Sequence, residues 1–310
     1  MSNRPTDPEV LAFIDETARH YPETSNRASA DEARAAYNAL CKAFDYPHPA
    51  GVSTKDSTVE AANPDREIPA RHYTSGKLIG TCLMYLHGGG WIVGGLESHD
   101  SICAEICANT GMDVIAVDYR LCPEHRHPAA LDDCEAAFTE VAGRYDTIIV
   151  GGDSAGGHLT AALCIRLRDA AGRQPAGQLL IYPAVGILPE GGSYESNADA
   201  PGLTTDDVIH YWGILAGDAD WRTTTDAGLA PIRAADFSDL PPAIISSAGI
   251  DPIRDDAMHY ASRLTEAGVP VQWRNDPQLI HGHLRARHMS KVAAAHFRWI
   301  CDALTRLAEN

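Results

Sequence analysis

The feature that most constrains the fold is a regular alternation of short apolar runs with helical stretches. The runs with the length and composition of buried strands are CLMYL, VIAVDY, TIIV, QLLIY, AIISSA and VQW, at residues 82–86, 114–119, 147–150, 178–182, 243–248 and 271–273. Helical patterns occur at about 99–110, 132–143, 155–170, 255–267 and 285–308. Strands that alternate with helices predict an α/β fold whose mainly parallel sheet carries helices on both faces.

The first fifty residues predict two amphipathic helices instead of strands. In the first helix, Asp7 can cap the N-terminus, and Val10, Leu11 and Ile14 form the apolar stripe. The second helix begins at the capping-box pattern S-x-x-E of residues 29–32.

Two later segments interrupt the alternation. Residues 51–75 predict two extended segments broken by Asn63-Pro64. Residues 186–230 are rich in Gly, Asp and Thr, contain one helical pattern near 205–216 and join two core strands. An insertion at this point lies over the carboxyl edge of the sheet, where such folds bind ligands.

Composition excludes several classes of function. The 310 residues include 42 acids and 25 bases, a formal net charge of -17, which disfavours nucleic acid or an anionic membrane as partner because both require a basic face. No apolar run approaches the roughly 18 residues of a membrane helix, and residues 1–10 lack the apolar core of a secretory signal. None of the eight cysteines forms a C-x-x-C pair, so we expect a reduced, cytoplasmic protein without a metal site.

The strongest chemical signal is the pentapeptide Gly152-Asp153-Ser154-Ala155-Gly156, which follows the run TIIV and opens a helix. A serine hydroxyl is a poor nucleophile unless it is held clear of its own backbone beside a base. A sharp strand-to-helix turn presents it in this way, and glycines on either side avoid collisions. In this context G-x-S-x-G is the pattern of a nucleophile elbow. The alternative is a glycine-rich turn that contains a serine by coincidence.

A second glycine-rich segment, His87-Gly88-Gly89-Gly90, follows the run CLMYL. Consecutive glycines let the backbone approach a substrate closely and aim its amides inward, and each such amide stabilises a developing oxyanion by about 3–4 kcal/mol. We therefore expect an oxyanion hole at Gly88, Gly89, Gly90 and Ala155, in which the last three supply amides and Gly88 shapes the turn. Phosphate binding is the competing interpretation, but no P-loop lysine lies nearby.

The base and the acid that orients it follow the serine if the order is nucleophile, acid, base. Asp251 comes directly after the run AIISSAGI, and His281 follows the last predicted strand. The imidazole takes the serine proton and the carboxylate holds its tautomer in such a triad. His283 is a rival base, and Asp255 and Asp256 are rival acids that can instead serve the first turn of the next helix.

Together these motifs resemble the signatures of the hormone-sensitive-lipase-like esterases, the bacterial family IV branch of the α/β-hydrolase fold. The matching segments, which follow the order of the family, are HGGGW (87–91), YRLCPEHRHPAAL (119–131), GDSAGG (152–157), LPPAIISSAGIDPIRDD (240–256) and IHGH (280–283). The resemblance runs from about residue 66 to the C-terminus. It implies an eight-stranded sheet with one antiparallel strand, and it implies Ser154 as nucleophile, Asp251 as acid and His281 as base.

The resemblance also implies the organisation and partners of the chain. It predicts one compact unit in which helices cap the core, with N-terminal cap helices at 1–50, core at 51–185, a cap insert at 186–230 and core at 231–310. It implies a small ester as substrate, with no cofactor and no metal. It also allows a homodimer, because related enzymes often pair through their last strand and helix.

Four positions depart from the pattern of the family. His158 stands where asparagine is usual, His283 replaces a common phenylalanine, Cys122 an alanine and Asp256 a glutamate. None of these belongs to the predicted triad or oxyanion hole, so the predicted reaction class is unchanged. His158 and His283 could alter the polarity of the pocket or the pH profile; the alternative is that the fold accommodates both.

The substrate pocket is less specifically marked than the triad. The candidate pocket residues lie beside the motifs or in the insert, and they are Trp91, Asp153, His158, Tyr182, Leu203, Trp212 and Leu215. Packing within the core is the alternative role for Trp91 and Tyr182.

The predicted function is a serine carboxylesterase that cleaves short- to medium-chain acyl esters through an acyl-enzyme intermediate. One alternative is a cap-covered receptor without catalysis, as in the plant gibberellin receptors, which resemble this family but lack the catalytic histidine. The presence of His281 with Ser154 and Asp251 argues against it. Another alternative keeps the triad but cleaves an amide or a lactone through the same type of intermediate.

Overall fold

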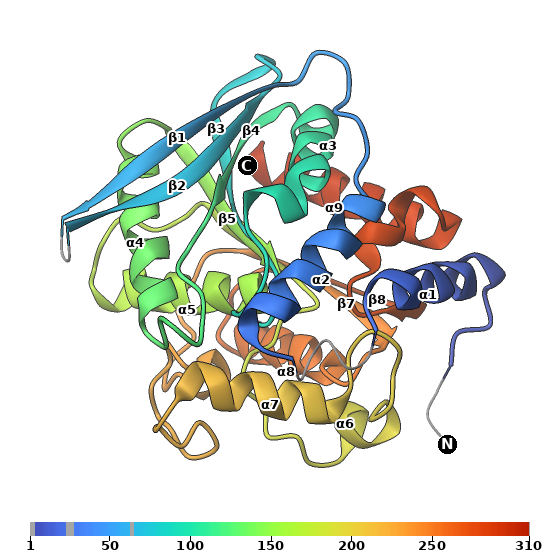
Figure 1. Ribbon diagram of the computed structural model, residues 1–310. Coiled ribbons are helices and arrows are strands. Elements are labelled where there is room, and N and C mark those ends of the chain that lie inside the picture. Colours follow the sequence, from blue (N-terminus) through green and yellow to red (C-terminus); the bar gives the residue numbers. More distant parts are fainter. Residues whose placement is uncertain (1–3, 23–27, 63–64, 310) are drawn as a thin grey trace.

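A computed structural model describes residues 4–22, 28–62 and 65–309 (Figure 1). Its centre is an eight-stranded sheet of order β1-β2-β4-β3-β5-β6-β7-β8, in which β2 runs antiparallel to both neighbours and the other pairs are parallel. The strands are β1 (Ser53–Ala62), β2 (Asp65–Thr74), β3 (Leu78–Leu86), β4 (Met112–Val117), β5 (Thr147–Asp153), β6 (Gly177–Ile181), β7 (Ala243–Ile250) and β8 (Val271–Ile280). The predicted α/β fold is confirmed, while the break expected at Asn63-Pro64 lies outside the described residues.

Helices cover both faces of this sheet, so its central strands are mostly apolar and buried. Strands β6 and β7 are buried at every position. Helices α3 (Asp100–Thr110) and α9 (Lys291–Ala308) pack together on one face. Helices α4 (Ala129–Ala142), α5 (Ala155–Asp169) and α8 (Arg254–Glu266) pack on the other face. No helix within the described ranges is long and apolar enough to cross a membrane.

The last part of the chain differs from the sequence prediction. Strand β8 extends to Ile280, well past the run VQW, and lies at the sheet edge, where it needs less apolar character. The helix expected at 285–308 is two elements: a 3₁₀ helix, η4 (His283–His288), and then α9. The hydroxyl of Ser290 caps α9 by accepting the amide of Ala293, and this cap separates the two elements.

Helix α1 (Pro8–His20) is capped by Asp7 as predicted, but the apolar stripe is placed differently. Val10 and Phe13 are buried, whereas Leu11 is 41% exposed, so the prediction of a buried Leu11 is wrong. Phe13 packs edge-on against Phe44, with ring centroids 5.2 Å apart. The contact between these rings decides which face of the amphipathic helix turns inward.

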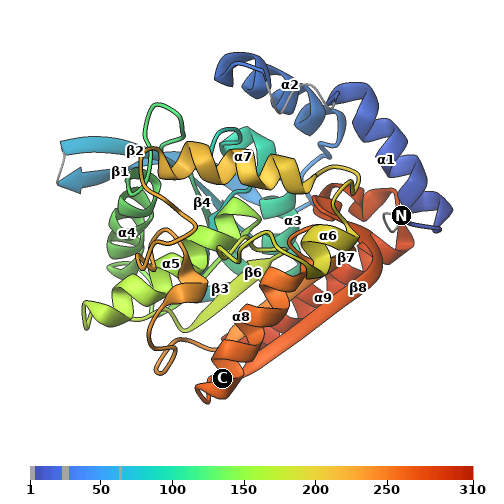
Figure 2. The same ribbon diagram turned by 90° about the horizontal axis from the view of Figure 1, so that it is seen from below.

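Figure 2 shows three further helices, which come from the N-terminal segment and from the insert. Helix α2 (Ala30–Ala43) begins at the predicted capping box. Helix α7 (Thr205–Ala216) matches the helical pattern of the insert, and the short α6 (Gly192–Ser196) was not predicted. The short 3₁₀ helices η2 (Leu96–His99) and η3 (Pro231–Arg233) complete the described elements.

Candidate active site

Ser154 lies in the sharp turn between β5 and α5, with φ of 54° and ψ of -116°. Residues other than glycine rarely adopt these backbone angles, because the conformation is strained. The strain persists only where contacts with the surrounding structure fix the conformation. The amide of Ser154 donates to the carbonyl of Ile181 at 2.8 Å. A Cβ atom on either Gly152 or Gly156 would collide with the carbonyl oxygen of Leu86. These two glycines therefore let the turn pack directly against the end of β3.

A continuous chain of hydrogen bonds joins Ser154, His281 and Asp251. Nε2 of His281 lies 2.9 Å from Oγ of Ser154, and Nδ1 lies 2.7 Å from Oδ2 of Asp251. Asp251 is fully buried, and its other carboxylate oxygen accepts the amide of Ile253 at 3.0 Å. The three residues follow or end β5, β7 and β8, parallel strands whose carboxyl ends meet at one edge of the sheet. With Nδ1 donating to the carboxylate, Nε2 is free to accept the serine proton.

The rival base and the two rival acids form hydrogen bonds elsewhere and, among the described residues, do not contact Ser154 or one another in a triad. Nδ1 of His283 is 3.1 Å from the carbonyl oxygen of Ile280, and its ring is buried. Asp255 and Asp256 accept hydrogen bonds from residues 185–194, so they tether the insert to α8 instead of serving only the first turn of that helix. Burial raises the pKa of Asp256 to about 7.

The glycine-rich loop after β3 divides into two parts. The amide of Gly88 donates to Oδ1 of Asp153 at 2.9 Å, so Gly88 shapes the turn and its amide is not available as an oxyanion donor. Gly89 and Gly90, with φ of 133° and 59°, line the cavity beside Ser154 and Ala155. Only glycine fits readily at these positive φ angles. Gly88 therefore has the turn-shaping role expected of it, and the three expected amide donors, Gly89, Gly90 and Ala155, border the cavity.

Asp153 is the buried carboxylate that joins this loop to the turn before Ser154. Its Oδ1 accepts the hydroxyl of Tyr85 at 2.8 Å and the amide of Gly88, and it lies 3.1 Å from Nε2 of His99. The hydroxyl of Tyr182 donates to Oδ2 at 3.3 Å. Burial raises the pKa of Asp153, but the charge and hydrogen bond of His99 and the hydrogen bond of Tyr85 outweigh it, so this pKa lies below its usual range. The ionised carboxylate therefore holds both loops in register.

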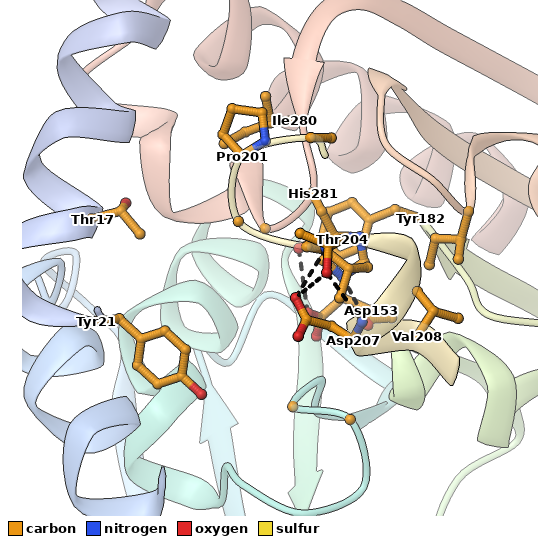
Figure 3. A pocket seen from close by; sticks show the side chains of 18 of the residues that line it. Thr17, Tyr21, Asp153, Tyr182, Pro201, Thr204, Asp207, Val208, Ile280 and His281 are labelled. Carbon is orange, nitrogen blue, oxygen red and sulfur yellow. Dashed lines mark hydrogen bonds between the residues drawn. The ribbon is translucent and has the colours of Figure 1, made fainter. Parts of the chain in front are cut away.

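A cavity of about 680 Å³ opens at Ser154 and His281. Its walls include five predicted pocket residues, Trp91, Asp153, Tyr182, Leu203 and Trp212. Figure 3 shows the contributions of distant segments, with Thr17 and Tyr21 from one side and Pro201, Thr204, Asp207 and Val208 from another.

Several lining residues were not predicted as site residues. Helices α1 and α2 contribute Phe13, Thr17, Tyr37 and Leu40 to the wall, and Tyr21 contributes from just beyond the end of α1. Their helical spacing is visible in the sequence, but the same spacing is typical of a face packed on the core. Which part of that face borders empty space depends on how the helix docks.

Two predicted pocket residues lie behind the cavity wall and are corrected here. His158 is fully buried, accepts the indole N–H of Trp91 at 3.2 Å through Nδ1, and places Nε2 3.2 Å from the carbonyl oxygen of Leu229. Leu215 is packed in the main core cluster. Neither belongs to the lining found among the described residues. Burial lowers the pKa of His158 to about 3, so the ring is neutral near pH 7.

Comparisons with known proteins identify the family of this chain. A family model described as alpha/beta hydrolase fold matches residues 83–285. The chain is 35% identical over 285 residues to the carboxylic ester hydrolase LipN of Mycobacterium tuberculosis, which covers 88% of this chain and 75% of that protein. It is 41% identical over 221 residues to the carboxylesterase NlhH of the same species, covering 68% and 69%. The solved structure of a bacterial heroin esterase superposes with a TM-score of 0.88 at 31% identity and covers 98% of both chains. The chain therefore belongs to the α/β-hydrolase family, in its hormone-sensitive-lipase-like branch.

Proposed function

We propose that this protein is a serine carboxylesterase that hydrolyses short- to medium-chain acyl esters through an acyl-enzyme intermediate. The observation that carries the proposal is the hydrogen-bonded chain of Ser154, His281 and Asp251 at the wall of a cavity. The names of the relatives LipN and NlhH, a carboxylic ester hydrolase and a carboxylesterase, support the same reaction.

In the first half of the proposed reaction, Oγ of Ser154 attacks the carbonyl carbon of the ester. Nε2 of His281 takes the hydroxyl proton, and Asp251 stabilises the imidazolium that forms. The carbonyl oxygen becomes an oxyanion, which accepts hydrogen bonds from the backbone amides of Gly89, Gly90 and Ala155. His281 then returns the proton to the departing alkoxide, so an alcohol leaves and the acyl group stays on Ser154.

In the second half, water takes the place of the alcohol. His281 accepts one water proton while the oxygen attacks the acyl carbon, and a second oxyanion forms at the same amides. Collapse of this intermediate breaks the bond to Oγ, and His281 returns the proton to Ser154. The products are a carboxylic acid and the regenerated serine.

We further propose that α1, α2 and the segment 186–230 act as a cap on a single compact unit. Both parts contribute side chains to the cavity wall, for example Tyr21 from beyond the end of α1 and Val208 from α7 (Figure 3). The core parts are then 51–185 and 231–310. A cavity of about 680 Å³ has the size of a small-molecule site.

The first test replaces the nucleophile. Ser154→Ala should lower kcat for a p-nitrophenyl ester by on the order of a millionfold, as removal of the serine does in other triads. Acid-quenched wild-type protein should carry one acyl group on Ser154 by mass spectrometry, and the variant should carry none. An unchanged urea unfolding curve is the control for folding. Turnover near the parent rate would show that the nucleophile is misassigned.

The second test measures acyl-chain length. In a series of p-nitrophenyl esters from acetyl to lauroyl, kcat/KM should fall beyond about hexanoyl, because a cavity enclosed by capping helices limits the chain that fits. A maximum at lauroyl would contradict the short-chain proposal while leaving the esterase reaction intact.

A further inference from the structure

Arg285 is a buried cation in the wall of the catalytic cavity. It lies in η4, four residues after His281, is 8% exposed and borders the same space as Ser154. Nη1 donates to the carbonyl oxygen of Ser98 at 2.9 Å, and Nη2 donates to the hydroxyl of Tyr37 at 2.8 Å. Both acceptors are neutral. Within the described part of the chain, no carboxylate forms an ion pair with this guanidinium.

A neighbouring arginine shows how this chain normally compensates such a charge. Arg287 is 4% exposed and forms a forked pair with Glu105, through Nε at 3.0 Å and Nη2 at 2.6 Å. A buried guanidinium is costly unless a carboxylate matches it. Arg285 is two residues away and nearly as buried, but its fork has no such partner.

The carboxylate whose charge acts on Arg285 already has other hydrogen-bond partners. Asp153 influences Arg285 through its charge, but its hydrogen bonds come from Tyr85, Gly88, Tyr182 and His99. Burial lowers the pKa of Arg285, but Cys41, Tyr37 and Asp153 more than offset it, so this pKa lies above its usual value and the guanidinium remains ionised.

Apart from Asp153, the acidic residues that line the cavity in the described part of the chain belong to a different wall. Asp199, Asp206 and Asp207 lie on the insert and the start of α7, and Asp207 accepts the amide and the hydroxyl of Thr204 (Figure 3). Arg285 is bordered instead by α2 and η2, through Tyr37 and Ser98. The wall of the cavity beside α2 therefore carries a cation, Arg285 of η4.

We propose that Arg285 selects ester substrates that carry a carboxylate, which takes the ion-pair position left open in the cavity wall. The planar guanidinium binds carboxylates in a forked geometry, and such a pair is stronger in a cavity that excludes water than in bulk solvent. Tyr37 and Ser98 hold the guanidinium in place before substrate arrives. The proposal rests on the esterase function, and it leaves two positions for the carboxylate, in the acyl part or in the alcohol part.

Matched pairs of esters distinguish these positions. For the acyl part, the mono-p-nitrophenyl ester of glutaric acid is compared with p-nitrophenyl pentanoate. For the alcohol part, 4-acetoxybenzoate is compared with its methyl ester. In at least one pair the wild-type kcat/KM should favour the anionic ester by about tenfold or more, which corresponds to one well-placed ion pair. Arg285→Met should abolish that preference, and Arg285→Lys should retain part of it.

Control variants separate selectivity from stability. Arg285→Met should lower kcat/KM for the anionic ester about tenfold more than for its neutral partner, because only the anionic ester loses an ion pair. Arg19→Met removes an exposed cation of α1 that lies outside the cavity lining, and it should change both esters of a pair by the same factor. Equal wild-type rates within both pairs, or a loss in Arg285→Met that is equal for neutral and anionic esters, would overturn the proposal.

Measurements on the wild-type protein cover the case in which Arg285→Met does not fold. Glutarate should bind by calorimetry and inhibit competitively, whereas glutaramide should do neither. KM for the preferred anionic ester should rise with ionic strength from about 0.02 to 0.5 M, while KM for its neutral partner stays constant. Glutarate carries the carboxylate in the acyl position and 4-hydroxybenzoate carries it in the alcohol position. If neither of them binds, the role of Arg285 is refuted. If glutarate binds but neither ester type is cleaved, the esterase function fails instead.

Discussion

His158 is a polar residue that the core accommodates through contacts on both ring nitrogens. Nδ1 accepts the indole N–H of Trp91, and Nε2 faces the carbonyl oxygen of Leu229. The neutral tautomer with its proton on Nε2 satisfies both contacts. Burial is the main reason that its pKa falls to about 3, followed by the charge of His127. The ring therefore links α5 to the end of the insert and contributes no charge to the cavity near pH 7.

Burial of His158 should make the stability of the protein depend on pH. The pKa of this histidine is about 3 in the folded chain against about 6.5 in the unfolded chain, so the unfolded state binds the proton first as the pH falls. The contribution to stability is complete above pH 6.5 and is lost on acidification, by about 2 kcal/mol between pH 7 and pH 5. In His158→Asn, urea unfolding at these two pH values should show a smaller difference than in the parent.

The same variant tests whether His158 acts on the reaction. Because its ring lies outside the cavity lining, the pH–rate curve of His158→Asn on a neutral ester should overlay the parent curve. A displaced curve would show that His158 reaches the triad.

At the scale of elements, glycines set how closely the turn at Ser154 approaches β3. Gly156 lies in the first turn of α5, and an added Cβ would collide with the backbone at Leu86. Gly213 lies in α7, where an added Cβ would meet no atom within 4 Å. Two glycines in helices therefore have opposite consequences, because only one of them separates two packed backbones.

Alanine substitutions should reveal this contrast. Gly156→Ala should cost about 1–3 kcal/mol of stability through overpacking, and displacement of Ser154 should lower kcat by on the order of a hundredfold. Gly213→Ala should raise stability by about 0.5–1 kcal/mol, since alanine favours the helix, and should leave kcat unchanged. The measurements are urea unfolding and turnover of p-nitrophenyl acetate. Equal effects of the two substitutions would show that the turn does not depend on this close approach.

At the scale of the whole molecule, Arg34 joins α2 to two loops of the core. Its Nε donates to the carbonyl oxygen of Ile92 at 3.0 Å, and its Nη atoms bind the carboxylate of Glu124 at 2.8 and 2.7 Å. A further bond reaches the carbonyl oxygen of Cys122. These contacts link residues far apart in the chain, and they bring a proposed cap helix against the loop that follows Gly90.

Removal of this link should loosen the docking of α2. Arg34→Met should lower the free energy of unfolding by on the order of 2 kcal/mol, because several charge-assisted hydrogen bonds are lost together. The matched control is Arg19→Met, which removes an exposed pair with Glu16 on α1 and should cost less than about 1 kcal/mol. Urea unfolding of both variants checks this prediction. A cost for Arg34→Met no larger than that of Arg19→Met would rule out a role in docking.

The local sequence was sufficient for the order of strands and helices and for the candidate nucleophile. Apolar runs, capping residues and glycine-rich turns depend on a few neighbouring residues, so they can be recognised in the sequence without knowledge of the fold. The identification of Ser154 depended on such a turn. The choice of Asp251 and His281 also relied on the resemblance, and rivals two to five residues away remained open.

Only the tertiary structure decided which of several equivalent residues meet. It placed Asp251 against His281 while Asp255 and Asp256 contact the insert. It turned Phe13 inward and Leu11 outward, and it set Arg285 in the cavity wall without a carboxylate partner among the described residues. These outcomes depend on packing between segments that lie 30 to 248 residues apart in the chain. The periodicity of one segment does not specify the surface against which it will pack.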